Sequence, residues 1–178
     1  MLPPLVERAL ALAERLAFER SCSIETGRLL HVLAGQRGRS RIAEIGTGCG
    51  VGAAWILSAL PPDAAFVTVE LDAERAALTA ELFAGDAHAR VVHGDWREVL
   101  AGEAPFDLLF ADGGKAKAHA ELAGLLTFGG TLVLDDLTPG RGRPDPVRDL
   151  WLRHPRVAAV ELQLSPHEAV IVGTLQPR

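Results

Sequence analysis

The chain has 178 residues, 48% of them hydrophobic and 23% charged, which suits one globular domain with a sizeable core. Its formal net charge of −5 argues against a protein that coats nucleic acid or a membrane surface. Two cysteines, Cys22 and Cys49, are too few for a disulfide framework and lack metal-ligand spacing. We therefore expect a single cytoplasmic domain over residues 1–178, without a signal peptide or a membrane span.

Helical and strand patterns alternate along the chain. Residues 1–38 predict two N-terminal helices, Pro4–Glu19 and Ile24–Leu33, and residues 39–178 predict a sheet-based core. Short apolar or β-branched runs that end near Gly or Asp predict the first strands of this core. These strands are Arg41–Ile45, Ala65–Glu70, Arg90–His93, Phe106–Ala111 and Thr131–Asp135. The helices predicted between them are Gly50–Leu60, Asp72–Ala84, Trp96–Leu100 and Lys115–Leu126.

The last forty residues have a different pattern. A loop rich in Pro and Gly, Thr138–Pro146, precedes a predicted helix near Val147–His154. Two further strands, Val157–Leu164 and Ala169–Leu175, are separated only by Ser-Pro-His, which predicts a hairpin. The order of elements predicts an α/β fold: a doubly wound, mostly parallel, Rossmann-like sheet with a C-terminal antiparallel hairpin.

A glycine-rich loop follows the first predicted strand. In RIAEIGTGCGVGAAW the strand ends near Glu44, and Gly46, Gly48, Gly50 and Gly52 alternate before a helix opens. Such glycines let the backbone turn tightly beside a ligand, and the helix start offers free N–H groups. Glu70 ends the second strand, where a carboxylate can accept both ribose hydroxyls of an adenosine-containing cofactor. These two features predict a nucleoside cofactor and leave NAD open as one candidate.

Further acidic residues follow the remaining parallel strands. HGDW ends the third strand with Asp95, FADGGK ends the fourth with Asp112, and GGTLVLDDL ends the fifth with Asp135 and Asp136. The carboxyl ends of parallel strands share one edge of the sheet, so these acids are predicted to converge on one crevice. An NAD-dependent oxidoreductase would leave the last three aspartates unexplained.

The succession EIGTGCG, VELD, GDW, FADGGK and GGTLVLDD resembles class I S-adenosylmethionine-dependent methyltransferases, and within them the cation-dependent O-methyltransferases that act on catechols and caffeoyl-CoA. The resemblance runs from about Cys22 to Leu175. It implies S-adenosylmethionine and a divalent cation as cofactors, with Mg²⁺ expected and Mn²⁺ or Ca²⁺ as alternatives. The acceptor would be a small catechol-like molecule, and the protein would form a homodimer as many relatives do.

The resemblance also implies a role for each matching residue. Glu44, Gly46 and Gly48 would lie by the methionine part of the cofactor, with Cys22 near the same end, and Glu70 would hold the ribose. Lys115 would be the general base, provided that burial beside a cation lowers its pKa. The residues that would face adenine are Gly94, Asp95 and Trp96, and those that would hold the metal are Asp112, Asp135 and Asp136, of which Asp112 would also border the cofactor.

This chain departs from the family pattern at several places. Asp136 stands where the family usually has Asn, and the added charge predicts that metal affinity holds or rises. Gly52 replaces a small hydroxyl residue that contacts the methionine carboxylate in many relatives. Arg141 and Arg143 in the loop, with the basic run Arg37–Arg41, leave open a hydroxylated nucleoside of tRNA as acceptor, although the acidic charge disfavours nucleic acid. The altered motifs also leave open a non-catalytic S-adenosylmethionine-binding protein.

Overall fold

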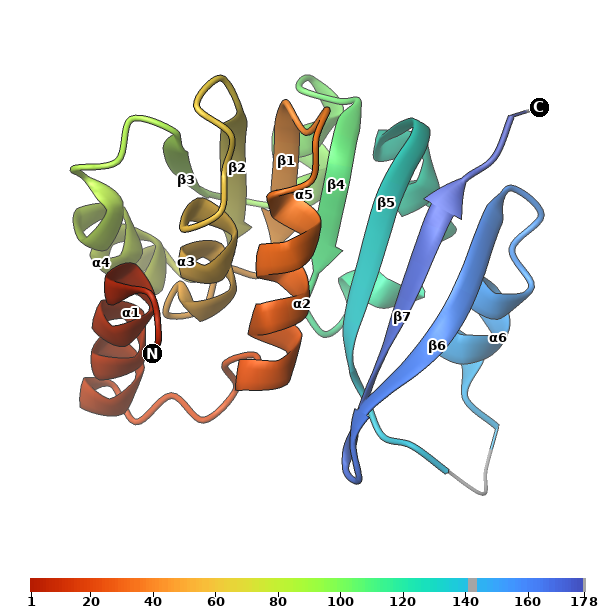
Figure 1. Cartoon of the computed structure of the whole chain (residues 1–178), viewed down its shortest axis with the longest axis horizontal. Coiled ribbons are helices and arrows are strands. Elements are labelled where there is room, and N and C mark those ends of the chain that lie inside the picture. Colours follow the sequence, from red (N-terminus) through yellow and green to blue (C-terminus); the bar gives the residue numbers. More distant parts are fainter. Residues whose placement is uncertain (141–143, 178) are drawn as a thin grey trace.

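The computed structural model describes residues 1–140 and 144–177, and its strands form a seven-stranded sheet in the order β3-β2-β1-β4-β5-β7-β6 (Figure 1). The bounds are β1 (Arg41–Ile45), β2 (Ala65–Glu70), β3 (Ala89–His93), β4 (Phe106–Ala111), β5 (Leu126–Leu137), β6 (Val157–Ser165) and β7 (Glu168–Leu175). The strands from β3 to β5 pair in parallel, whereas β7 pairs antiparallel with both β5 and β6. The predicted fold class and the C-terminal hairpin are therefore confirmed.

Helices cover both faces of the sheet, as Figure 1 shows for α2 in front and α6 behind. One apolar cluster joins the first four helices to one face, and the other joins α5, the 3₁₀ segments and α6 to the opposite face. The bounds are α1 (Pro4–Arg15), α2 (Ile24–Ala34), α3 (Val51–Leu57), α4 (Ala73–Phe83), α5 (Trp96–Ala101), η1 (Ala116–Ala118), η2 (Ala120–Leu125) and α6 (Pro146–Leu152). Because both faces are covered, the central strands are apolar along most of their length.

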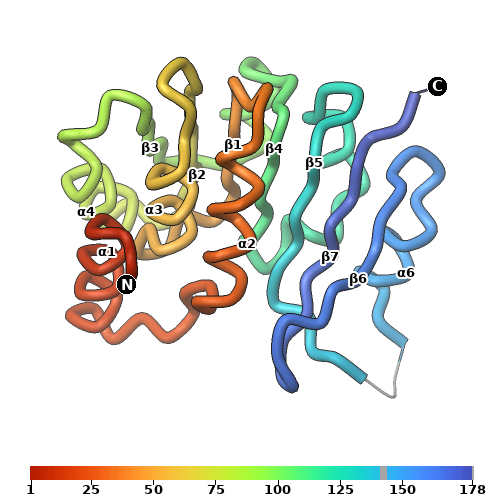
Figure 2. The backbone as a smooth tube through the Cα atoms, in the orientation of Figure 1, coloured from red at the N-terminus to blue at the C-terminus, as the bar shows by residue number. Residues whose placement is uncertain are grey.

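The carboxyl ends of the parallel strands lie together at the lower edge of Figure 1, where the segment that joins α1 to α2 also passes (Figure 2). The helix predicted over Pro4–Glu19 ends at Arg15, because Ala17 takes a left-handed φ of 48° and the Phe18 N–H turns back to the Ala13 carbonyl. Residues 18–23 are then free to run along this edge.

The helix predicted over Lys115–Leu126 is wrong. The structure has two short 3₁₀ segments there, η1 and η2. Two glycines precede the segment, and the Lys117 carbonyl accepts a hydrogen bond from the indole Nε1 of Trp151 at 2.6 Å instead of a helical N–H. Trp151 lies on α6, so a contact that is 34 residues away in sequence overrides the local helical pattern.

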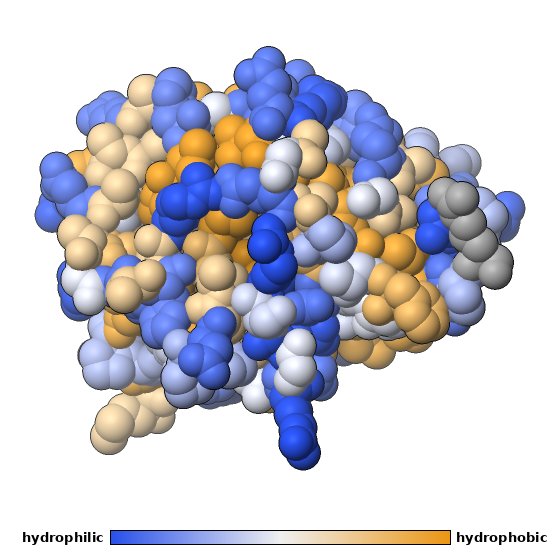
Figure 3. Space-filling view, turned by 90° about the horizontal axis from the view of Figure 1, so that it is seen from above, coloured by the Kyte–Doolittle hydropathy of each residue, from blue (hydrophilic) through white to orange (hydrophobic). Residues whose placement is uncertain are grey.

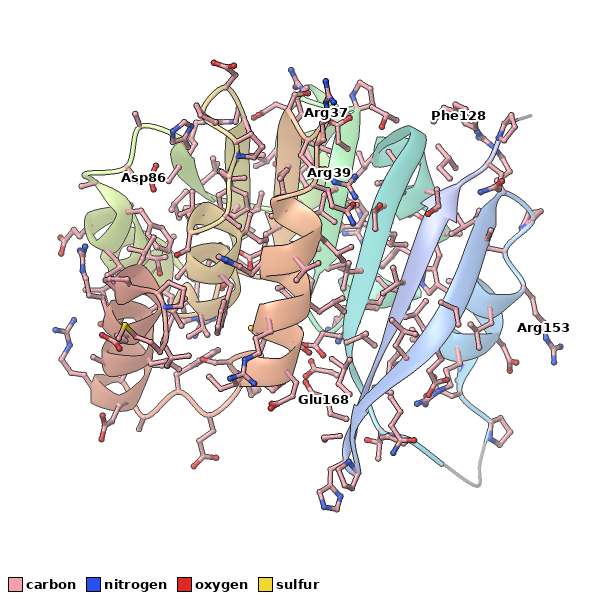
Figure 4. The ribbon with its side chains drawn as sticks, in the orientation of Figure 1. Arg37, Arg39, Asp86, Phe128, Arg153 and Glu168 are labelled. Atoms are coloured by element: carbon pink, nitrogen blue, oxygen red, sulfur yellow. The ribbon has the colours of Figure 1, made fainter. Side chains whose placement is uncertain are left out.

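The basic run Arg37–Arg41 is not a purely solvated face. Arg39 is half-buried and donates to the Leu33 carbonyl at 3.1 Å and to the Thr131 hydroxyl at 2.8 Å. The labelled arginines of this run lie at the edge opposite Glu168 (Figure 4). Figure 3 views this upper edge, where hydrophilic side chains surround smaller apolar areas. The run therefore lies far from the edge where the strands end.

Among the described residues, no helix is both long enough and apolar enough to span a bilayer.

Candidate active site

A cavity of about 590 Å³ opens at the carboxyl edge of the sheet. This volume lies in the range of small-molecule sites. Its walls come from the loop after β1, the ends of β2 and β4, the start of α5 and the segment between α1 and α2. Predicted site residues in its lining are Gly46, Gly48, Glu70, Gly94, Asp95, Trp96, Asp112, Lys115 and Asp136. Segments that are distant in sequence thus share one wall, as the strand-end pattern predicts.

The glycine loop has the left-handed backbone that its sequence predicts. Gly46, Gly48 and Gly50 have φ values of 92°, 54° and 81°. A Cβ on Gly46 would lie 2.6 Å from the Gly113 nitrogen, because the loops after β1 and β4 pack against each other. A Cβ on Gly48 would lie 2.9 Å from the ring of Phe18, another cavity residue. Residues larger than glycine would therefore narrow the cavity at this wall and strain the backbone of the loop.

Glu44 lies beneath this loop and is absent from the cavity lining. The Thr68 hydroxyl donates to Glu44 Oε2 at 2.5 Å, and burial raises the pKa of Glu44 well above its usual range. A Cβ on Gly52 would lie 2.5 Å from Glu44 Oε1. The carboxyl group of Glu44 therefore takes the space beside Gly52, and a side chain at position 52 would clash with it.

Glu70 is held at the cavity wall by three donors. Its Oε2 accepts from the Gly48 N–H at 2.8 Å, and its Oε1 accepts from the Asp72 N–H and from Arg75 Nη2, both at 3.0 Å. Glu70 is 5% exposed. Arg75 and Phe18, which lies under the Arg75 guanidinium, also line the cavity, and sequence reasoning missed both. Arg75 follows the helix cap Asp72 by three residues, a spacing that could have identified it.

The start of α5 forms the far end of the cavity. Asp95 caps this helix by accepting from the Arg97 N–H at 2.9 Å. The Trp96 ring meets the His119 ring edge-on at 5.9 Å, and Arg97 Nη2 donates to His119 Nε2 at 2.8 Å. Asp95, Trp96 and His119 all line the cavity, so the predicted adenine-facing residues share one wall with a histidine from the loop after β4.

Three aspartates, here called the acidic cluster, lie together beside the cavity: Asp112 after β4, and Asp135 and Asp136 at the end of β5. Asp112 and Asp136 line the cavity. One carboxylate oxygen from each lies within 4.8 Å of the other two. Asp135 is 2% exposed, whereas the side chain of Asp136 is 66% exposed. Asp136 has a φ of 59°, rare for a residue other than glycine, and its N–H donates to Asp135 Oδ1 at 2.7 Å.

Crowding of like charges shapes the acidity of the acidic cluster. Burial raises the pKa of Asp112 well above its usual range, and the carboxylates of Asp136 and Asp135 raise it further, while Lys117 opposes them. Burial also raises the pKa of Asp135 to about 6, although the hydrogen bond from the Asp136 N–H opposes the rise. Glu168 adds to it and shares the hydroxyl donor Thr26 with Asp135. Protonation or a bound cation relieves such crowding.

The two lysines near the acidic cluster differ in burial. Lys115 lines the cavity but is exposed, so the burial expected of it is not observed. Lys117 is 5% exposed, and its Nζ donates to the Asp135 carbonyl at 2.8 Å and to Asp136 Oδ2 at 3.0 Å. Sequence reasoning missed Lys117, although its position two residues after Lys115 was a signal.

A second cavity of about 270 Å³ adjoins the acidic cluster. Asp135, Asp136, Glu168 and Cys22 line it. Cys22 also lines the larger cavity, and burial raises the pKa of its thiol, with the carboxylates of Asp112 and Asp135 acting in the same direction. Arg141 and Arg143 lie outside the described residues, so their predicted role near the acceptor is not tested.

Curated proteins of known description are similar to this chain in sequence. A Mycobacterium tuberculosis protein described as "Probable O-methyltransferase" is 33% identical over 129 residues, which cover 67% of this chain and 58% of that protein. A Mycobacterium ulcerans protein with a similar description is 32% identical over 143 residues, 75% of this chain and 64% of the relative. The chain thus spans less than two thirds of the length of these curated relatives.

Solved structures share the fold. The O-methyltransferase from Bacillus cereus, in complex with SAH (S-adenosylhomocysteine), superimposes with a TM-score of 0.84 at 21% identity, covering 99% of this chain and 92% of that one. The O-methyltransferase TomG from Streptomyces achromogenes, in complex with SAM (S-adenosylmethionine), gives 0.80 at 22% identity with the same coverage. Residues 43–137, more than half of the chain, match the family model described as a methyltransferase domain. The chain belongs to this methyltransferase domain family.

Proposed function

We propose that the protein transfers a methyl group from S-adenosylmethionine to a hydroxyl of a small catechol-like acceptor, in a reaction that depends on a divalent cation. The observation that carries this proposal is the acidic cluster, of which Asp112 and Asp136 line the same cavity as Glu70 and the glycine loop. The similar proteins described as O-methyltransferases, two of them in complex with SAM or SAH, support O-methyl transfer from S-adenosylmethionine. Calorimetric titration with S-adenosylhomocysteine and with NADH tests the choice of cofactor: the first should bind and the second should not.

The cavity residues fit the parts of this cofactor. Both carboxylate oxygens of Glu70 are hydrogen-bond acceptors, and the N–H groups of Gly48, Asp72 and Arg75 hold the carboxylate in one orientation. It would accept the two ribose hydroxyls. Trp96 and His119 supply aromatic surface for adenine, with Asp95 nearby as an acceptor for the amino group. Gly46 and Gly48 leave the backbone open on the methionine side. The cofactor supplies an electrophilic methyl group when bound.

The acidic cluster fits a hard divalent cation. Such cations prefer oxygen ligands, and two oxygens on opposite sides of a bound Mg²⁺ or Ca²⁺ lie about 4 to 5 Å apart. Spacing within 4.8 Å agrees with this requirement, and a bound cation would relieve the crowding that raises the pKa values of Asp112 and Asp135. Asp112, Asp135 and Asp136 would hold the cation, which would lower the pKa of an acceptor hydroxyl and orient the acceptor.

Lys115 is the residue that we assign to proton removal. A phenol with a pKa near 10 is mostly protonated at neutral pH, so an acceptor needs a base as well as a cation. Lys115 lines the cavity three residues after Asp112, on the same segment after β4. Lys115 is exposed here, so it would take the hydroxyl proton only once the bound cation and acceptor cover it and favour its neutral amine form. We propose that this enzyme is cytoplasmic, lies within one domain and acts as a homodimer.

Replacement of Glu70 should weaken cofactor binding. Glu70→Ala removes charge-assisted hydrogen bonds to two hydroxyls, and we expect a loss of about 1.5–3 kcal/mol in the binding free energy of S-adenosylhomocysteine. Glu70→Gln preserves the packing and should lose part of this affinity. Glu74→Ala is the matched control, because Glu74 is an exposed carboxylate on α4 outside the cavity lining. Calorimetry that gives equal affinity for the wild type and Glu70→Ala would refute ribose recognition by Glu70.

The metal-free protein should become more stable as the pH falls from 7 to 5. The pKa of Asp135 in the folded protein is about 6, above the value near 3.9 of an unfolded chain, so the folded state binds the proton more tightly. The free energy of unfolding should therefore rise by about 1 kcal/mol between pH 7 and pH 5 and fall again as the pH increases through 6. Urea unfolding in chelator measures it. Asp135→Asn should remove this contribution, whereas those of Glu44 and Asp112, whose pKa values burial also raises, should remain. An unchanged pH dependence in that variant would contradict the assignment.

A further inference from the structure

The acidic cluster already contains a positive charge that belongs to the chain. Lys117 Nζ bridges two consecutive residues, with the Asp135 carbonyl at 2.8 Å and Asp136 Oδ2 at 3.0 Å. Lys117 is buried, and its charge also acts on the acidity of Asp112. The ammonium group therefore contacts one of the three carboxylates that the proposed cation would use.

The position of Lys117 is built into the fold. Its carbonyl accepts from Trp151 Nε1 at 2.6 Å, and Trp151 is fully buried on α6. The 3₁₀ segment η1 turns the side chain of Lys117 inward, while Lys115, two residues earlier, stays exposed. Burial of a lysine side chain costs rotamer entropy and solvation, so a buried lysine is retained where a specific partner stabilises it. Here the specific partners are the Asp135 carbonyl and the Asp136 carboxylate at the end of β5.

We propose that Lys117 is an internal occupant of the acidic cluster, which a divalent cation must displace from Asp136, so that Lys117 weakens and thereby sets the metal affinity of the site. This inference rests on the proposed metal site. It also changes the expectation that the extra carboxylate of Asp136 keeps or raises metal affinity: the chain itself neutralises that charge through Lys117.

The physical reason is repulsion between like charges at short range. A divalent cation bound to the Asp136 carboxylate would lie a few ångströms from the ammonium of Lys117, in a region where burial weakens solvent screening. Metal binding must therefore break the contact between Lys117 Nζ and Asp136 Oδ2, or bear the repulsion. Either cost reduces the measured affinity. In the metal-free protein, the same contact neutralises one carboxylate and supports the unusual backbone of Asp136.

Metal titration of two lysine variants tests the proposal. Lys117→Met keeps the length and apolar stem of the side chain but removes the charge, and we expect Mn²⁺ to bind at least about tenfold more tightly than in the wild type. Lys115→Met is the matched control, because it removes the same charge from the same segment at an exposed position. Its Mn²⁺ affinity should stay within about twofold of the wild type. Calorimetry or the electron paramagnetic resonance signal of free Mn²⁺ gives both affinities.

A second measurement uses the wild-type protein and keeps the proposal testable if Lys117→Met does not fold. Lys115 and Lys117 are the only lysines in the chain, so lysine labelled with ¹⁵N at Nζ gives two signals. The signal of Lys117 should disappear in Lys117→Arg and shift strongly when Mg²⁺ is added. Acylation followed by mass spectrometry should show Lys117 protected without metal and reactive with it, while Lys115 reacts in both states.

The outcomes separate this proposal from the metal site itself. If the wild type and Lys117→Met bind metal with equal affinity, the role of Lys117 is overturned and the metal site stands. The same holds if the wild type binds metal while Lys117 stays protected. Metal binding by Lys117→Met alone supports the role of Lys117 and shows that the wild type does not use the cation. If neither protein binds metal, both proposals fail. A lower melting temperature of Lys117→Met without tighter metal binding would assign Lys117 a structural role only and would also overturn the proposal.

Discussion

Asp135→Ala should abolish methyl transfer while leaving the binding of S-adenosylhomocysteine nearly unchanged. Asp135 is buried at the end of β5 and lines the smaller cavity, whereas the cofactor would occupy the larger one, which Asp135 does not line. Loss of a ligand to the cation removes several kcal/mol of transition-state stabilisation, so we expect turnover to fall by about 10³-fold or more.

Two measurements make this prediction specific. Calorimetry should give the same affinity for S-adenosylhomocysteine in the variant and the wild type, and a radiolabelled methyl-transfer assay should give the loss of turnover. Asp63→Ala is the control, since Asp63 is an exposed carboxylate in the turn before β2, which starts at the opposite edge of the sheet. Turnover within tenfold of the wild type in Asp135→Ala would remove this residue from the catalytic machinery.

Lys115→Ala should slow turnover by about 10²–10⁴-fold, the usual contribution of a general base. Metal affinity should remain intact, because Lys115 is exposed at the cavity wall while Lys117 contacts the acidic cluster. Lys115→Arg keeps the positive charge but cannot accept a proton at neutral pH, so it should be about as slow as Lys115→Ala.

The pH dependence distinguishes a base from a charge that merely attracts the acceptor. If Lys115 removes the proton, turnover of Lys115→Ala should rise with pH, because hydroxide from the solvent then removes the proton in place of the lysine. An added primary amine should restore part of the rate. If Lys115→Arg instead retains full activity, Lys115 acts through its charge, and its assignment as the base is wrong.

The positions of the strand ends could be predicted from the sequence because one rule governs them. In parallel strands the carboxyl ends share one edge, so Glu70, Asp95, Asp112 and Asp135 had to approach each other once the βα order was recognised. The structure brings all four to the two cavities at that edge. The tight turn of the glycine loop could be predicted equally well, because glycines that alternate before a helix indicate a backbone that turns close to a ligand.

Other features depend on contacts that local patterns do not contain. The inward turn of Lys117 depends on Trp151, and the half-buried position of Arg39 depends on Thr131, which lies 92 residues away. The exclusion of Glu44 from the cavity depends on its hydrogen bond with Thr68 of the neighbouring strand. Each of these partners is distant in sequence, so composition and periodicity could not identify them.

The most direct test of the account is methyl transfer from radiolabelled S-adenosylmethionine to a panel of catechols, with and without a chelator. We expect methylated product in the presence of Mg²⁺ or Mn²⁺, loss of product in excess chelator, and recovery when the cation is restored. The reason is that the chelator would remove the cation that Asp112, Asp135 and Asp136 together hold. Asp135→Ala should give no product under any of these conditions. Full activity of the wild type in excess chelator would contradict the metal mechanism and indicate a methyltransferase that works without metal.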